Sequence, residues 1–257
     1  MDYPTHLLDE VKKNSKYFQL EGFLSGNGSP QAKAMLVGEA PGQTELVTKL
    51  PFTGQAGKEL DNELEQAGLS REDLYITSVV RSRPYKIKKR INKDGTVSES
   101  RPNRTPTKAE VLAHAPLIDY EIQHIKPKII APMGNIALKR LLGNKYTISA
   151  FHGQVLNDSI FQLSDDRSTY VKSTDRYIIF PLYHPAAVLY NRSLADVISK
   201  DWRALFELIN KLSDSHSFLV ACRNDLIIVP TLNTNRMMLK TSNHQPMKLP
   251  KISPSII

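Results

Sequence analysis

The sequence contains a single cysteine, Cys222, among 257 residues. An internal disulfide needs two thiols and an all-cysteine metal or iron–sulfur site needs several, so both are excluded. No run of 18 apolar residues is present, which excludes a membrane-spanning helix. The first residues also lack the basic start and apolar core of a secretory signal peptide. We therefore expect a cytoplasmic protein that needs no metal or cofactor and does not bind membranes.

Composition is that of a soluble globular protein, with 40% hydrophobic and 23% charged residues. The length suits one sizeable domain with an appendage. We place the domain at residues 1–212. Residues 213–257 are rich in proline and asparagine and lack periodicity, apart from a candidate strand at 226–229. We interpret them as a C-terminal appendage or a partly disordered tail.

Positive charge is concentrated in one segment. The whole chain carries +8, and residues 81–108 alone contain ten Lys or Arg against Asp94 and Glu99. A basic block beside a functional site is typical of proteins that bind a phosphate backbone. The alternative is a solvated, flexible loop that charge keeps soluble.

Apolar runs of strand length alternate with segments of helical periodicity, which predicts a parallel sheet with helices on both faces. The expected strands are 33–38, 74–80, 128–133 and 177–183. The expected helices are 5–20, 56–67, 107–126, 135–142 and 195–212, and residues 150–176 suggest a hairpin or an irregular excursion.

Two polar clusters follow the first and last expected strands, namely residues 38–42 and His184 with Pro185. Functional groups collect beyond the carboxyl ends of parallel strands, so both clusters are expected to face one pocket.

These clusters belong to a set of four motifs in order: Gly-Glu-Ala-Pro-Gly at 38–42, Pro-Phe-Thr-Gly at 51–54, Tyr-Ile-Thr-Ser-Val-Val-Arg at 75–81, and His184-Pro185. Together they resemble the uracil-DNA glycosylase superfamily, and most closely its family 4 type, over about residues 5–212. The resemblance implies an α/β fold, a three-layer α/β/α sandwich with a central four-stranded parallel sheet. It also implies an enzyme that flips uracil out of DNA, at a cost of a few kcal/mol. Water then hydrolyses the N-glycosidic bond, which initiates base-excision repair.

The resemblance also assigns catalytic roles. Glu45 is expected to hold the attacking water, with Glu39 as a carboxylate near the sugar, although these two roles can be exchanged. His184 is expected to donate to the uracil oxygen that gains negative charge. The alternatives are structural: Glu45 caps the following helix or accepts from loop amides, and His184 is an ordinary buried histidine.

The remaining expected contacts fall into two groups. Substrate-binding residues are Gly38, Ala40, Gly42, Phe52 and Ser78, where Phe52 stacks on the base and the main chain at Ala40 and Gly42 reads it. DNA-binding residues are Arg81, Lys88, Lys89, Arg90, Leu189, Tyr190 and Arg192, where Leu189 and Tyr190 form the wedge that fills the vacated space. The alternatives are a plain tight turn, a loop anchor for Phe52, a disordered basic loop and an ordinary helix start.

The chain departs from the family pattern at three places. Ser82 and His114 stand where two of the four cluster cysteines are expected, so the iron–sulfur cluster is absent. Ser78 replaces the base-reading asparagine, which puts strict uracil specificity in doubt and leaves room for other deaminated bases. Asn92 stands at the position of a histidine through which one relative becomes attached to DNA, so we expect no crosslink.

The leading hypothesis is a monofunctional uracil-DNA glycosylase that acts on uracil-containing DNA as a monomer. One alternative is a non-catalytic DNA-binding or uracil-sensing module on the same fold. Another is a nucleotide or nucleoside hydrolase, against which the basic segment argues.

Overall fold

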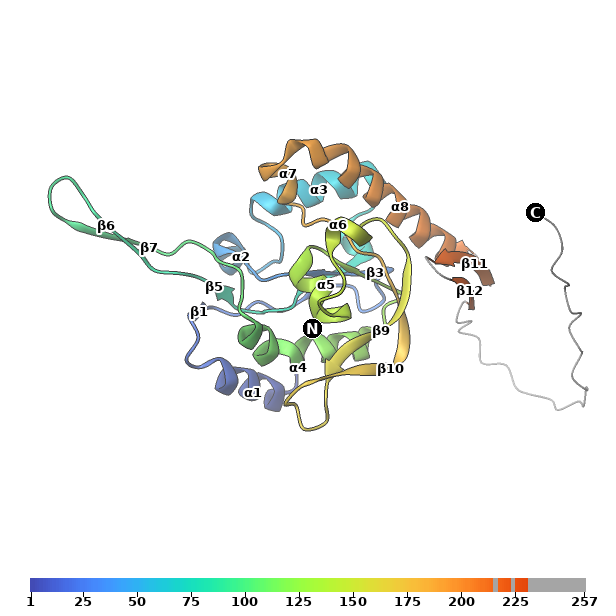
Figure 1. The fold of residues 1–257 in the computed structure, drawn as a ribbon, viewed down its shortest axis with the longest axis horizontal. Coiled ribbons are helices and arrows are strands. Elements are labelled where there is room, and N and C mark those ends of the chain that lie inside the picture. The colour runs from blue at the N-terminus through green and yellow to red at the C-terminus, as the bar shows by residue number, and fades with distance from the viewer. Residues whose placement is uncertain (215–216, 223–224, 231–257) are drawn as a thin grey trace, which may run out of the picture.

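A six-stranded sheet forms the centre of the protein, whose computed structural model describes residues 1–214, 217–222 and 225–230. The strand order is β2-β4-β3-β8-β10-β9 (Figure 1). The strands are β2 (Asn27–Gly28), β3 (Ala34–Gly38), β4 (Leu74–Ser78), β8 (Ile129–Pro132), β9 (Leu156–Leu163) and β10 (Tyr170–Ile179). The four central strands, β4, β3, β8 and β10, run parallel, which confirms the predicted parallel sheet.

The sheet is wider than predicted because an antiparallel strand is added at each edge, β2 beside β4 and β9 beside β10. β2 is only two residues long and lies in a loop rich in glycine and asparagine, so no apolar alternation marks it. The segment 150–176 does contain the suggested hairpin, since β9 pairs with β10. β10 begins at Tyr170, earlier than the predicted 177. The prediction missed its first half because those residues are mostly exposed and polar, so no apolar run marks them.

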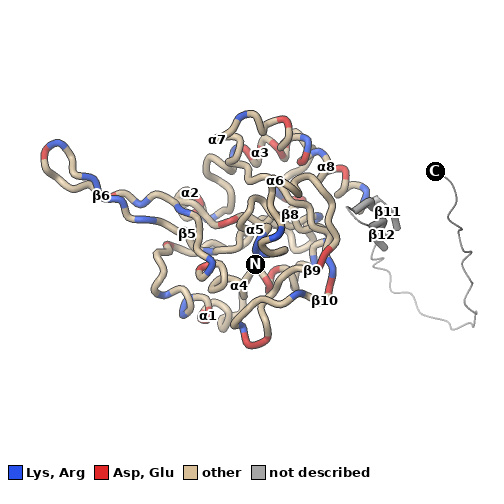
Figure 2. The backbone as a smooth tube through the Cα atoms, viewed as in Figure 1, with Lys and Arg blue, Asp and Glu red and all other residues tan. Residues whose placement is uncertain are grey.

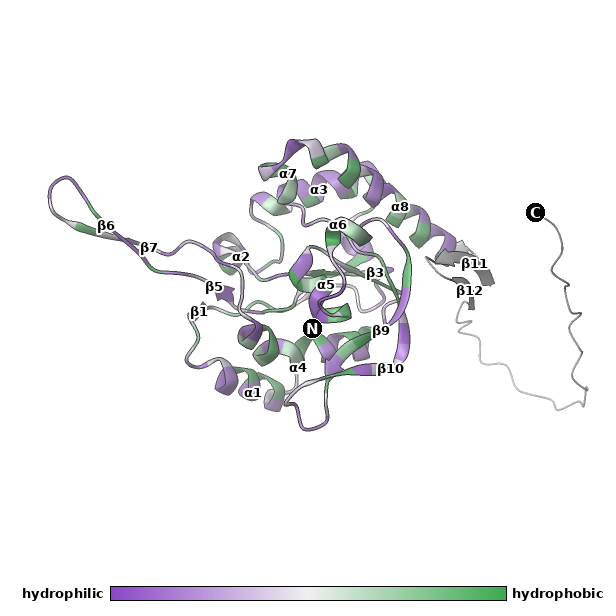
Figure 3. Ribbon diagram, in the orientation of Figure 1, coloured by the Kyte–Doolittle hydropathy of each residue, from purple (hydrophilic) through white to green (hydrophobic). Residues whose placement is uncertain are grey.

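Helices cover both faces of the sheet, which confirms the three-layer sandwich. In Figure 1, α3 and α8 lie on one side and α4 on the other. Their bounds are α3 (Gln55–Ala67), α8 (Ala195–Asp214), α4 (Lys108–Ile125) and α5 (Asn135–Leu142). α3, α5 and α8 mix hydrophilic and hydrophobic residues in Figure 3, as expected of helices with one buried side. α4 is buried along most of its length, because α1 covers its outer side.

Alternate residues of β3 divide between two cores. Leu36 belongs to the core that contains Leu60 of α3 and Trp202 of α8. Met35 and Val37 belong to the core of α4 and α5. Because the two faces of a strand alternate with every residue, a short run of buried residues supplies both layers.

The helix α1 (Thr5–Ser15) packs on α4 through Leu7, Val11 and Leu117. α4 begins with the predicted capping box: the Glu110 amide donates to Thr107 Oγ1 at 3.3 Å, and the Thr107 amide donates to the Glu110 carboxylate at 2.8 Å. The capping box thereby fixes the residue at which α4 begins.

A two-stranded hairpin, β6 (Lys88–Ile91) and β7 (Val97–Ser100), projects from the body of the molecule (Figure 1). Figure 2 shows lysine and arginine along much of this basic segment. The remaining short elements are β1 (Leu20–Glu21), α2 (Gln43–Thr48), η1 (Arg71–Asp73), β5 (Arg83–Pro84), α6 (Ile148–Phe151), α7 (Ala187–Tyr190) and η2 (Arg192–Leu194).

After α8 the chain forms two antiparallel strands, β11 (Ser217–Cys222) and β12 (Asp225–Pro230). The predicted strand at 226–229 lies within β12. The rest of the expected tail, 231–257, lies outside the described residues, and the domain boundary at 212 stays a prediction. Among the described residues no helix has the length and apolar character that a bilayer crossing requires.

Candidate active site

A cavity of about 480 Å³ opens at the carboxyl ends of the parallel strands. Eight of the predicted site residues line it: Ala40, Gly42, Glu45, Phe52, Ser78, His184, Leu189 and Tyr190. They come from the turn after β3, from α2 (Gln43–Thr48) and the loop that follows it, from the end of β4 and from the segment after β10. The strand topology therefore gathers into one cavity residues that lie far apart in the sequence.

His184 lies in this cavity with a defined protonation state. Its Nδ1 accepts from the Ala186 amide at 3.2 Å, so the proton of the neutral ring is on Nε2. Burial lowers the pKa of His184 to about 4, and the nearby Glu45 carboxylate opposes that shift. At neutral pH the imidazole is therefore uncharged and has one N–H to donate.

Phe52 faces His184, with the two ring centroids 5.6 Å apart and the planes tilted by 37°. The Phe52 backbone is in the left-handed region, at φ 55°. Gly38 lies under the ring, since a Cβ at this position would be 2.7 Å from the Phe52 Cζ. The predicted role of Gly38 is therefore indirect: it makes room for Phe52.

Arg71, which sequence reasoning missed, holds the Phe52 loop in place. Its guanidinium donates to the Pro51 carbonyl at 2.9 Å and also to the Phe52 carbonyl. Asp61 on α3 accepts from Arg71 Nε at 2.6 Å. Arg71 follows Ser70, the N-cap of η1, and nothing in its local pattern indicates a contact with residues 51–52.

Glu45 is buried and accepts from two loop amides, Gly42 at 3.1 Å and Gly54 at 2.9 Å. The structural alternative for Glu45 is therefore present: the carboxylate caps α2 and joins the first two motifs. It also lines the cavity and keeps lone pairs for a further donor. The single proton of the Gly42 amide is used in this contact, which contradicts the prediction that this amide reads the base.

Gly42 instead leaves space between two polar groups. A Cβ there would be 2.8 Å from Glu45 Oε2 and 3.1 Å from Asn103 Nδ2. These two atoms therefore flank the same point, one as an acceptor and the other as a donor. Arg83 Nε donates to Asn103 Oδ1 at 2.5 Å, which fixes the amide so that Nδ2 is the free end.

Glu39 does not line the main cavity. It lines an adjoining one of about 350 Å³, together with Arg104 and Thr105, and His184 and Tyr190 border both cavities. Burial raises the pKa of Glu39, and a hydrogen bond with Thr105 opposes the shift. The two predicted carboxylates thus approach His184 from different cavities.

Ser78 lines the main cavity at the end of β4, but its hydroxyl donates to the Val80 carbonyl at 2.8 Å. With its proton committed, this side chain can offer a base only acceptor lone pairs.

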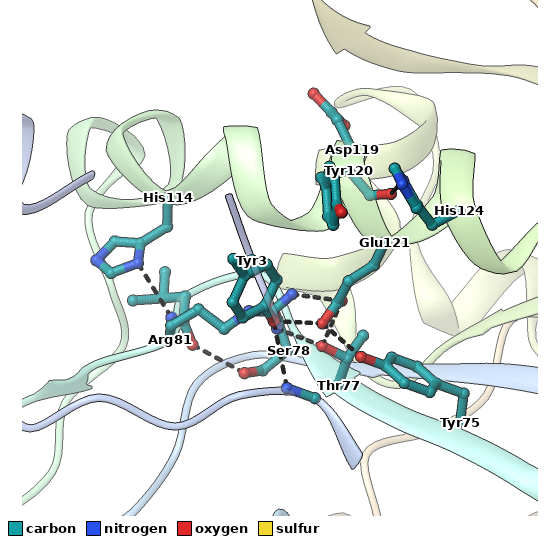
Figure 4. Close-up of polar contacts among 12 residues, drawn as sticks. Tyr3, Tyr75, Thr77, Ser78, Arg81, His114, Asp119, Tyr120, Glu121 and His124 are labelled. Atoms are coloured by element: carbon teal, nitrogen blue, oxygen red, sulfur yellow. Dashed lines mark hydrogen bonds and ion pairs between the residues drawn. The ribbon is translucent and has the colours of Figure 1, made fainter. Parts of the chain in front are cut away.

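Arg81 does not face solvent, which contradicts its predicted contact with DNA. Its side chain is 1% exposed and pairs with Glu121, which is 0% exposed, at 2.5 Å. It also donates to Thr77 Oγ1 and to the Ser78 carbonyl. Figure 4 shows that these groups converge from β4, the loop after it and α4. A buried guanidinium needs such partners and cannot reach a phosphate.

Glu121 collects three further donors in this buried network: Tyr3 at 2.5 Å, Tyr75 at 2.8 Å and Thr77 at 2.7 Å (Figure 4). Burial raises the pKa of Tyr3 to about 12. The Arg81–Glu121 network, as we call these five residues, joins the N-terminal segment and α4 to β4. It adjoins His114, one of the two residues that stand at expected cysteine positions.

His114 accepts from the Arg81 amide at 3.2 Å through Nδ1, and burial lowers the pKa of His114 to about 3. Ser82, which follows Arg81 in the chain, is also buried. In the part of the chain that the structure describes, no three His, Cys, Asp or Glu side chains are grouped as metal ligands.

The other predicted DNA contacts lie outside the cavity or at its mouth. Lys88, Lys89 and Arg90 are exposed on β6, and Arg192 is exposed on η2. Leu189 and Tyr190 are exposed on α7 at the cavity mouth.

Two arginines of the basic segment anchor the hairpin. Arg83 donates to Glu21 at 2.6 Å and to Asn103, whereas Arg104 forms two bonds with Glu110, at 2.6 and 2.8 Å. Sequence reasoning missed Asn103. Its role depends on the contact with Arg83, 20 positions away, which no local sequence pattern indicates.

Comparison of the sequence with known proteins identifies relatives that share this part of the chain. Residues 25–206 match the model of the uracil DNA glycosylase superfamily. The type-4 uracil-DNA glycosylase of Saccharolobus solfataricus is 30% identical over 218 residues, which cover 82% of this chain and 88% of that protein. Its counterpart in Sulfurisphaera tokodaii is 33% identical over 187 residues, covering 71% and 73%.

A DNA polymerase of Bacillus phage SP01 is 29% identical over 187 residues, which cover 72% of this chain but 17% of the polymerase. The family match spans all four motifs and the eight predicted residues that line the cavity. The chain therefore belongs to the uracil-DNA glycosylase superfamily.

Proposed function

We propose that this protein is a monofunctional uracil-DNA glycosylase, which flips uracil out of DNA and hydrolyses its N-glycosidic bond with water. The observation that carries the proposal is the pairing of a neutral imidazole donor, His184, with the Phe52 ring across one cavity. The names of the relatives from S. solfataricus and S. tokodaii support the same activity.

The flipped base stacks on Phe52. Stacking of a base on an aromatic ring contributes about 1–3 kcal/mol, which offsets much of the cost of flipping. Gly38 below the ring and Arg71 on the loop hold Phe52 in position for this contact.

His184 Nε2–H donates to the uracil oxygen that becomes negative as the bond between the sugar and N1 breaks. A neutral donor in a dry site gives this stabilisation without an extra buried charge. One such donor contributes about 2.7–4 kcal/mol to lowering the barrier.

The attacking water occupies the point that Glu45 Oε2 and Asn103 Nδ2 flank above Gly42. The carboxylate accepts a proton from the water and the amide donates to its oxygen. The oxygen bonds to the anomeric carbon while the bond to N1 breaks and its electron pair leaves with uracil. Glu39, in the adjoining cavity, stabilises the positive charge on the sugar.

The absence of a lysine among the residues that line the main cavity supports water as the nucleophile. A glycosylase that also cleaves the strand uses an amine, which forms a Schiff base with the sugar.

The DNA approaches from the side of the cavity mouth. Leu189 and Tyr190 on α7 enter the stack where the base has left, and Arg192 contacts a phosphate. Lys88, Lys89 and Arg90 on the hairpin contact the DNA beside the flipped nucleotide.

The test is incubation with single- and double-stranded oligonucleotides that carry one uracil, followed by alkali to cleave abasic sites. We expect cleavage by the native protein and its loss, by a factor of about 10²–10³, in His184→Ala and Glu45→Ala. Tight binding to uracil-containing DNA without abasic product identifies a uracil-sensing module instead and refutes the proposed reaction.

A further inference from the structure

The β6–β7 hairpin has one uninterrupted register along its length. Lys88 pairs with Ser100 and Ile91 with Val97, and the isolated bridge between Tyr85 and Asn103 continues the same alignment towards the body. Because alternate residues of a strand point to opposite faces, odd-numbered side chains share one face and even-numbered side chains share the other.

The two faces differ in chemistry. The apolar face is odd-numbered and carries Ile87, Ile91 and Val97, which are 43%, 75% and 63% exposed. The cross-strand partners Lys89 and Glu99 lie among them on the same face. The cationic face is even-numbered, and its members are Lys86, Lys88, Arg90, Ser98 and Ser100. Three β-branched apolar side chains in water on an isolated hairpin are costly, which indicates a surface that is covered when a partner binds.

The apolar face leads into the proposed active site. Arg101 and Asn103 share its parity, and both line the cavity. The Arg101 guanidinium lies 5.5 Å from the centre of the Tyr85 ring, at the base of this face. From Tyr85 to Ile91 the face extends about 20 Å away from the cavity, at the usual rise of a strand.

We propose that the apolar face is a track for single-stranded DNA next to the flipped nucleotide, an inference that rests on the proposed function. A duplex presents phosphates and groove edges, whereas an unpaired strand also presents the flat apolar faces of its bases. Ile87, Ile91 and Val97 contact those base faces, and Lys89 contacts the phosphates between them. Arg101, whose guanidinium pairs with Glu99 at 3.3 Å, exchanges this exposed carboxylate for a phosphate at the cavity end of the track. The enzyme therefore holds an unpaired flank more tightly than a paired one.

Binding of uracil-free oligonucleotides tests this track independently of catalysis. The variant I87T/I91T/V97T keeps β-branched side chains and removes much of the apolar surface. We expect its dissociation constant for a single-stranded 20-mer to rise on the order of tenfold. Its dissociation constant for the matching duplex stays within about twofold of the native value, because no base faces are available there.

The matched control removes charge from the other face. We expect K86Q/K88Q/R90Q to weaken binding to both forms of DNA. The slope of log affinity against log salt concentration should fall by an amount that corresponds to up to about three phosphate contacts. Equal losses for single strand and duplex in I87T/I91T/V97T, or no loss in either, overturn the track. Failure of the native protein to release uracil refutes the proposed function but leaves this binding comparison decisive.

Discussion

The chemistry of the cavity depends on which hydrogen-bond donors of single residues are already used within the protein. The Ser78 hydroxyl donates its hydrogen bond to the Val80 carbonyl, and the Gly42 amide donates to the Glu45 carboxylate. The free donors with a fixed direction are His184 Nε2 and Asn103 Nδ2. The sequence suggests four groups that could contact the base, at Ala40, Gly42, Ser78 and His184. Hydrogen bonds within the protein occupy the donors of Gly42 and Ser78, whereas the His184 donor stays oriented and available.

The buried histidines make stability depend on pH. His184 and His114 have folded pKa values of about 4 and about 3, below the ordinary 6.5. The unfolded chain therefore binds more protons than the folded protein below pH 6.5, and stability falls as pH decreases from there towards the folded values. We expect the urea midpoint to fall between pH 6.5 and pH 4.

His114→Gln provides the control for this pH effect. The variant loses one titrating group, so its midpoint changes less over the same pH range, even if its stability at pH 7 is lower. The same pH dependence in native protein and variant contradicts the assignment to His114.

Gly38 is expected to tolerate no side chain. In Gly38→Ala the new Cβ meets the Phe52 ring, whose Cζ is 2.7 Å away, so the ring must move from the position that faces His184. We expect kcat/KM for uracil release to fall about tenfold or more, the equivalent of one lost stacking contact. An unchanged kcat/KM in Gly38→Ala would show that the Phe52 ring does not need this position for uracil release.

At the scale of elements, the Arg81–Glu121 network fixes how the N-terminal segment, β4 and α4 meet. Glu121 on α4 accepts from Tyr3 and from two residues of β4, while Arg81 bonds to the carbonyl of Ser78. The carboxyl end of β4, which lines the cavity at Ser78, is therefore fixed by the Arg81–Glu121 ion pair through the bond of Arg81 to the Ser78 carbonyl. Burial of that pair makes it sensitive to the loss of either partner.

Removing one partner of the pair is expected to destabilise the protein strongly. Arg81→Met leaves the Glu121 charge buried without compensation, and the free energy of unfolding should fall by about 3–5 kcal/mol. The double variant Arg81→Met with Glu121→Leu removes both charges and should recover a large part of that loss. Urea unfolding measures both; equal stability of the single and double variants excludes a coupled pair.

At the scale of the whole molecule, much of the fold was predictable from periodicity. The expected helix at 135–142 agrees with α5 to the residue, and the four parallel strands and their order along the chain are correct. β2 was missed because two residues carry no pattern. The DNA contact predicted for Arg81 was wrong because the positive charges of a basic segment do not reveal which of them are paired inside the protein.

The residues of the cavity were predictable where a motif carries them, as for Phe52 and His184. Arg71 and Asn103 were not, because their roles arise from contacts across 19 or more positions of the chain, such as Arg71 with Phe52 and Asn103 with Arg83. Only the three-dimensional arrangement brings these partners together.

A chelator should leave this protein unaffected. With one cysteine in the chain and a hydrogen-bonded network that joins the N-terminal segment, β4 and α4, neither folding nor uracil release should depend on iron. We expect incubation with EDTA, alone or with a mild oxidant, to leave both the melting temperature and the rate of uracil release unchanged. A fall in either shows that a bound metal supports the fold.

The carboxylate of Glu121, with its four protein donors, has a consequence for how the molecule matures. Its partners lie up to 118 positions away in the sequence, and Tyr3 at the start of the chain is one of them. The carboxylate is therefore fully satisfied only after the first residues have joined β4 and α4, so the N-terminal segment completes this part of the fold.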